Sequence, residues 1–154
     1  MNLSEIKQYL MERKLDCVLL IDDDEPTNFL NQMVVESSGY AEQVKIAQSG
    51  EEALEYLSQS SKTDKTKPCP DLIFLDINMP AMNGWEFLEK YQKLDEEHKG
   101  RVMIIMLTTS LFPEDKTHAA EIPEISGFEN KPLTQEKLDK IILHFFEKKQ
   151  KQIA

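Results

Sequence analysis

Residues 72–84 read LIFLDINMPAMNG, and this stretch decides the fold class. The apolar run 72–75 is continuous rather than alternating with polar residues, which is typical of a strand covered on both faces in a parallel sheet. The run stops at Asp76. Asn83, followed three residues later by Glu86, has the spacing of a helix start. The stretch therefore predicts a buried strand, a polar turn and a helix in direct succession.

Similar strand candidates lie on both sides of this stretch. Residues 17–21 and 102–107 are also near-continuous apolar runs, whereas 44–46 and 125–129 are shorter and more polar, which suits the edges of a sheet. Amphipathic helical patterns separate them, with apolar stripes at Leu30, Met33 and Val34, at Ala53, Leu54 and Leu57, at Phe87, Leu88, Tyr91 and Leu94, and at Leu138, Ile141, Ile142 and Phe145. Strand and helix thus alternate five times, which predicts a doubly wound α/β fold with one parallel sheet.

The chain has 154 residues, which fits one domain. We divide it into an N-terminal helical extension at residues 1–14 and a main domain at residues 15–154. The extension carries Leu3, Ile6 and Leu10 on one side of a helix.

Three further local signals refine the outline of the main domain. Pro113 suits the first turn of a helix, and Pro123 should end that helix early. Residues 58–70 are rich in Ser, Thr, Lys and Pro, and we expect a long surface loop there.

The charge, the apolar runs and the cysteines of the chain narrow the class of protein. A formal net charge of -10 disfavours non-specific binding to nucleic acid. No apolar run reaches the roughly 18 residues that a membrane helix needs, and the N-terminus lacks the layout of a secretion signal. We interpret Cys17 and Cys69 as reduced, partly buried thiols rather than a disulfide or metal site, and we expect the protein in the cytoplasm.

Polar residues stand where the predicted strands end. Asp22, Asp23 and Asp24 follow the first strand, and Asp76 follows the third. In open parallel sheets, ligands bind beyond the carboxyl ends of the strands. Clustered carboxylates repel one another, and a divalent cation removes that repulsion. Ligand sets made only of oxygen favour magnesium, manganese or calcium.

The later strands add a hydroxyl and an ammonium group. Thr108 ends the fourth strand and Lys131 ends the fifth. Lys131 would be a counter-charge for a phosphoryl group, and a carboxylate beside a metal, such as Asp76, can attack phosphorus to give an aspartyl-phosphate.

Each of these residues also has a simpler interpretation when taken alone. Asp24 could be a helix cap, Asp76 a turn residue, Thr108 a hydroxyl bonded to the backbone, and Lys131 a surface lysine. Their arrangement, with polar side chains at the ends of four strands, favours a functional site.

Four motifs resemble those of the response-regulator receiver family of two-component signalling, the CheY-like proteins. They are LLIDDDEP at 19–26, DINMPAMNG at 76–84, MLTTS at 106–110 and GFENKP at 127–132. The resemblance covers roughly residues 15–146. It implies a flavodoxin-like (βα)5 fold with strand order 2-1-3-4-5, preceded here by the extra N-terminal helix.

The resemblance also implies a magnesium site, with manganese as a substitute. Asp76 would accept the phosphoryl group and bind the metal. Asp23 would bind magnesium directly, Asp22 would act beside it, and Asn78 would contribute its backbone carbonyl.

The resemblance implies a switch as well. Lys131 would pair with the phosphate, and Thr108 would bond a phosphate oxygen. The rotamer of Phe128 would follow Thr108, changing the face formed by the fourth helix, fifth strand and fifth helix of the main domain. A core aromatic without a switching role is the other interpretation of Phe128.

Two further expectations concern single residues. The Lys131-Pro132 bond would be a cis peptide, and Trp85 is expected to pack in the core.

The partners implied are a sensor histidine kinase or a histidine phosphotransfer protein, and a dimer that forms on phosphorylation. We expect a stand-alone receiver without a DNA-binding domain or membrane contact, and no enzyme beyond self-phosphorylation and self-dephosphorylation on Asp76. The alternatives are a degenerate receiver that only binds partners, an aspartate-based phosphatase and an FMN-binding flavodoxin. Asn78 stands where such a phosphatase needs a second Asp, and the acidic run at residues 22–25 would repel a flavin phosphate.

Overall fold

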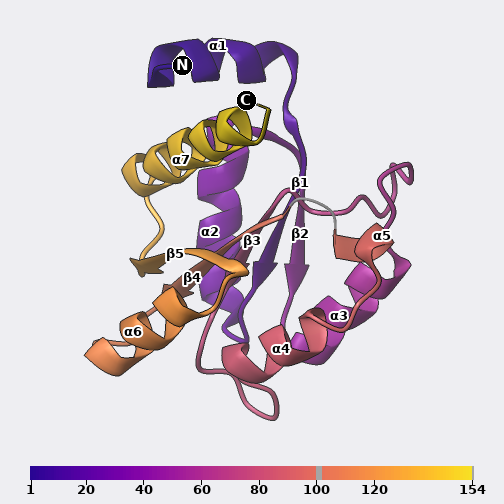
Figure 1. The fold of residues 1–154 in the computed structure, drawn as a ribbon, viewed down its shortest axis with the longest axis vertical. Helices are drawn as coiled ribbons and strands as arrows, with labels where there is room; N and C mark the ends of the chain where they lie inside the picture. The colour runs from indigo at the N-terminus through magenta and orange to yellow at the C-terminus, as the bar shows by residue number, and fades with distance from the viewer. Residues whose placement is uncertain (100–101, 154) are drawn as a thin grey trace.

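The computed structural model describes residues 1–99 and 102–153. Five parallel strands form one sheet in the order β2-β1-β3-β4-β5 (Figure 1). Their bounds are Leu15–Ile21 for β1, Ala41–Ala47 for β2, Leu72–Leu75 for β3, Met103–Thr108 for β4 and Ile125–Asn130 for β5. The predicted flavodoxin-like order and the edge positions of β2 and β5 are therefore confirmed.

Helices cover both faces of the sheet. In chain order they are α1 at Leu3–Glu12, α2 at Glu25–Ser38, α3 at Gly50–Gln59, α4 at Gly84–Tyr91, α5 at Glu96–Lys99, α6 at Pro113–Glu121 and α7 at Gln135–Ile153. Side chains of α1, α2 and α7 share one buried cluster, and those of α3, α4 and α6 share the other. The short helix α5 was not predicted.

The continuous apolar strands are explained by these two layers. Within β3, Leu72 and Phe74 belong to the first cluster, whereas Ile73 and Leu75 belong to the second. Successive side chains of a strand point to opposite faces, so a sheet covered on both faces needs apolar residues at every position.

Helix α1 is part of the core. Ile6 and Leu10 are buried, and the rings of Tyr9 and Phe146 meet edge to face at 5.6 Å. Lys7 also lies 3.5 Å from Asp139 of α7. The expected N-terminal helix is thus present and packs against α7 (Figure 1).

The predicted apolar stripe of α2 is only partly buried: Val34 packs against the core, but the other two residues do not. Leu30 and Met33 are 59% and 49% exposed, whereas Asn28, Asn31 and Val35 are buried. The side-chain amide of Asn28 donates to the backbone carbonyl of Asp22, and this tertiary contact turns the polar face of the helix toward the end of β1.

The predicted helix ends are largely correct. Asp24 caps α2 through a bond from the backbone N–H of Thr27, and Asn83 forms a capping box with Glu86 at the start of α4. Helix α6 begins at Pro113 and ends before Pro123.

The connection from α3 to β3 is only partly a surface loop. It begins after Gln59, and Pro68, Cys69 and Pro70 are buried. Both cysteines are free and buried. Over the described part of the chain, every helix is too short or too polar to cross a membrane.

Candidate functional site

The carboxyl ends of β1 and β3 bring three acids together. Ile21 pairs with Leu75 in the sheet register, so Asp22 and Asp76 leave neighbouring strands side by side. Carboxylate oxygens of Asp22, Asp23 and Asp76 all lie within 4.8 Å of one another, and we call these three residues the acidic cluster. Asp22 and Asp76 are buried, whereas Asp23 is exposed.

Backbone contacts fix the two buried acids. The N–H of Asp22 donates to Ala47 and that of Asp76 donates to Ile21, at 3.1 and 3.0 Å, which continues the sheet by one residue. Gly84 packs against the backbone beyond Asp76: a Cβ atom at position 84 would lie 2.6 Å from the Asp76 carbonyl oxygen. The start of α4 is therefore in direct contact with the Asp76 backbone.

Lys131 supplies the positive charge of the site. Its Nζ atom lies 2.5 Å from Oδ2 of Asp22 and 3.5 Å from Oδ1 of Asp76. Burial and the negative charge of Asp22 raise the pKa of Asp76 to about 6, against the opposing effects of Lys131 and of the Asn78 backbone N–H. The single ammonium group thus leaves the carboxylates incompletely neutralised.

The arrangement fits a hydrated divalent cation. Three carboxylates face one lysine, and burial, followed by the negative charge of Asp22, raises the pKa of Asp76, so a bound cation would favour its ionised form. Beside them, Oδ1 of Asn28 is buried without a hydrogen-bond partner within the described residues. An all-oxygen donor set of this kind suits magnesium, which keeps waters and takes few carboxylates.

The other expected site residues belong to strands β4 and β5 and to the turn after β3. Thr108 is buried, and its Oγ1 atom accepts a hydrogen bond from the Ser110 N–H at 3.1 Å. Phe128 is half-buried and stands opposite Met106 in the register. Asn78 is exposed. The Lys131-Pro132 peptide is cis, as the motif predicts.

Comparison with known proteins identifies the family of the chain. The family model described as the response regulator receiver domain matches residues 18–143. The chain belongs to the response regulator receiver family. Similar proteins include the response regulator Rcp1 of Synechocystis, 30% identical over 105 residues that cover 68% of this chain and 69% of that protein.

Two further relatives show how widely the domain occurs. A probable cyclic di-GMP phosphodiesterase of Vibrio cholerae is 34% identical over 114 residues, which cover 73% of this receiver but only 23% of that protein. A crystal structure of a two-component response regulator from Cytophaga hutchinsonii has a TM-score of 0.77 and 31% identity, and the match covers 88% of this chain and 99% of that one.

The receiver also contains an aromatic contact near the site that the sequence did not reveal. Trp85, half-buried at the start of α4, stacks on His118 of α6 with ring centroids 4.0 Å apart and planes 26° apart. Trp85 therefore packs against the core, as expected, and also bridges two helices through its stack on His118. Because it follows Gly84, it links α6 to the backbone beside Asp76.

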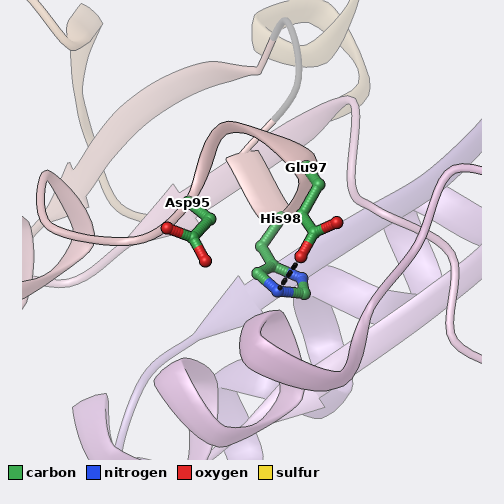
Figure 2. Close-up of side chains that lie close together, drawn as sticks. All are labelled: Asp95, Glu97 and His98. Atoms are coloured by element: carbon green, nitrogen blue, oxygen red, sulfur yellow. Dashed lines mark ion pairs between the residues drawn. The ribbon is translucent and has the colours of Figure 1, made fainter.

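A second group of acidic and imidazole side chains lies at the opposite end of the sheet, before β4. Figure 2 shows Asp95, Glu97 and His98, whose ligand atoms also lie within 4.8 Å of one another. Nδ1 of His98 donates to the Ser60 carbonyl at 2.9 Å, and Nε2 lies 3.2 Å from Glu97. These protein contacts account for the arrangement, and we assign no site there.

Proposed function

We propose that this receiver accepts a phosphoryl group on Asp76 in a magnesium-dependent reaction. The observation that carries the proposal is the acidic cluster, with carboxylate oxygens within 4.8 Å of one another and the Lys131 ammonium 3.5 Å from Asp76. Phosphoryl transfer depends mainly on positioning and on neutralising charge, and these groups supply both.

The metal-binding residues in this proposal are Asp22, Asp23, Asp76 and the backbone carbonyl of Asn78. Bound magnesium, or manganese in its place, neutralises charge on the phosphoryl oxygens. A carboxylate oxygen of Asp76 forms the new bond to phosphorus, and the bond from phosphorus to the donor breaks. When the donor is a phosphohistidine, the imidazole takes up a proton as it leaves. Lys131 then pairs with the phosphoryl oxygens.

The conformational switch begins at Thr108. Its oxygen already accepts from Ser110, so its O–H remains available as a donor to a phosphoryl oxygen. A phosphoryl group adds about 1.5 to 2 negative charges at this point, which draws Thr108 toward it. The space that Thr108 leaves admits Phe128, and the face made by α6, β5 and α7 changes.

The proposed phosphodonor is a sensor histidine kinase or a histidine phosphotransfer protein. A phosphorylation-dependent dimer through the α6-β5-α7 face would be one output, and a separate protein partner another. The proposed location is the cytoplasm, where buried, reduced thiols such as Cys17 and Cys69 persist. We propose no enzymatic activity on other substrates beyond the gain and loss of phosphate at Asp76.

Labelling with a small acyl phosphate tests the proposal. The wild type should gain one phosphoryl group when magnesium is present, and Asp76→Ala should gain none. Asp95→Ala, which removes an exposed acid outside the cluster, is the matched control and should be labelled normally. A wild type that binds magnesium but takes no phosphoryl group would instead support the degenerate receiver, a module that only binds partners.

A further inference from the structure

Asn28 is a buried amide that contacts the backbone of Asp22 in the acidic cluster. It lies in the first turns of α2 and is 1% exposed. Its Nδ2 atom donates to the backbone carbonyl of Asp22 at 2.8 Å. The carboxylate of Asp22 in turn pairs with Lys131. Asn28 therefore fixes the backbone from which one acid of the cluster projects.

The other half of the same amide has no partner. Oδ1 of Asn28 is the buried side-chain oxygen or nitrogen atom left unpaired among the residues that the structure describes. Leaving a buried acceptor unpaired costs about 1 to 3 kcal/mol, and buried groups of this kind require an explanation. Leucine has a similar size and would avoid that cost, so packing alone does not explain an amide at this position.

The location of Asn28 explains why an amide stands here. Asn28 lines the same narrow pocket as Asp22 and Asp76, and its Nδ2 atom donates to the Asp22 backbone carbonyl. Groups that hold the ligands of a metal, rather than the metal itself, set the orientation of those ligands and the affinity of the site.

We propose that Asn28 is a positioning residue for the cation site. Its amide N–H holds the Asp22 backbone so that this carboxylate stays in the acidic cluster. The inference rests on the magnesium-dependent phosphorylation proposed above. It adds a residue outside the recognised motif positions.

Magnesium titration of Asn28→Leu by calorimetry, without any acyl phosphate, tests this role. The dissociation constant should rise about tenfold, the lower end of the effect typical for such supporting residues. Gln32→Leu is the control, because Gln32 is an amide of the same helix whose side chain donates to Glu36 and does not line the pocket. Its magnesium affinity should stay within about twofold of the wild type, well below the effect of losing a ligand-positioning bond.

Labelling by acyl phosphate separates positioning from a merely structural role. In Asn28→Leu the magnesium concentration for half-maximal labelling should rise by the same factor, while labelling at saturating magnesium stays near the wild-type level. A structural role would instead reduce the folded fraction, seen as a lower urea midpoint, without changing the magnesium affinity of the folded protein. If Asn28→Leu does not fold, Asn28→Ala takes its place with the same expected result.

The outcomes distinguish the two proposals. Wild-type magnesium affinity in the folded Asn28 variant overturns the positioning role and leaves phosphorylation of Asp76 standing. A wild type that neither binds magnesium nor becomes labelled overturns both.

Discussion

The Lys131 ammonium lies 2.5 Å from the Asp22 carboxylate, joining the end of β5 to the end of β1 across 109 positions of sequence. The contact from Lys131 to Asp76 is longer, at 3.5 Å. Asp22 therefore takes the larger share of the lysine charge. The carboxylate of Asp76 is left more weakly paired, a favourable state for a group that must attack phosphorus.

Lys131→Ala should keep the fold and lose the response to phosphorylation. The labelled variant should show no change in Trp85 fluorescence, because the phosphoryl group lacks the cation that couples it to the switch. Trp85 is the only tryptophan in the sequence and stacks on His118, so it reports on α6. Lys140→Ala removes an exposed pair with Glu136 and is the control, with a normal response. A wild-type fluorescence change in labelled Lys131→Ala would refute the proposed coupling.

Asp76→Asn should stabilise the metal-free protein at neutral pH. Burial and then Asp22 raise the pKa of Asp76 from 3.8 to about 6, so the folded state disfavours its ionised form. The penalty is complete above about pH 6 and disappears below about pH 3.8. We expect a gain of about 1 to 3 kcal/mol in unfolding free energy at pH 7.5.

Urea denaturation at several pH values in the presence of a chelator measures this gain. The difference between Asp76→Asn and the wild type should shrink as the pH falls from neutral toward 4. A difference that is constant with pH would show that Asp76 carries no such penalty.

Gly84→Ala should both destabilise the domain and slow labelling of Asp76. The added Cβ would lie 2.6 Å from the Asp76 carbonyl oxygen and 3.1 Å from Cα of Ile77, and backbone atoms there cannot move without shifting the phosphoacceptor turn. Overpacking of this kind costs about 1 to 3 kcal/mol.

Gly39→Ala provides the comparison for Gly84→Ala. Gly39 ends α2 at φ +73° and has no atom within 4 Å of its added Cβ, so its substitution should cost about 1 kcal/mol through backbone strain alone. Labelling rates should then fall for Gly84→Ala and stay unchanged for Gly39→Ala. Equal rates of Asp76 labelling in the two variants would show that Gly84 does not support the phosphoacceptor turn.

Ile6→Ala should destabilise the whole domain, because α1 belongs to its core. Ile6 is 0% exposed, and removing a buried side chain of this size costs about 2 to 5 kcal/mol. Met11 of the same helix is 82% exposed, and Met11→Ala should change the unfolding free energy by less than about 0.5 kcal/mol. A small effect at position 6 would mean that α1 does not contribute to the stability of the core.

Much of the fold could be predicted because strands that are buried on both faces of the sheet appear in the sequence as continuous apolar runs. The run 72–75 matches β3 residue for residue, since all four side chains contact one of the two helical layers. The edge strand β2 extends from Ala41 to Ala47, beyond the predicted 44–46, because half-buried edge residues such as Gln43 do not show an apolar pattern.

The orientation of α2 could not be predicted from its apolar residues. Phe29, Leu30 and Met33 are exposed, and a hydrophobic stripe normally indicates the buried face of a helix. The helix instead directs Asn28 to the Asp22 carbonyl, a tertiary contact with no signature in the local sequence. The stack of Trp85 on His118 was missed for the same reason.

The acidic cluster could be predicted from order and spacing, since parallel strands deliver their following residues to one edge of the sheet. Chain topology, rather than any one motif, brings Asp22 close to Asp76. The positioning residue Asn28 could not be identified from the sequence, because a single amide after an acidic run resembles any other polar residue of a helix.

The most direct test of the central claim is to locate the phosphoryl group. The wild type is treated with a small acyl phosphate and magnesium, the acyl-phosphate bond is reduced with borohydride, and the modified residue is identified by mass spectrometry of peptides. The account predicts modification at Asp76 alone, dependent on the divalent cation and greatly reduced in Asp23→Asn. Modification at another carboxylate, or equal modification of Asp76 in the presence of a chelator, would contradict it.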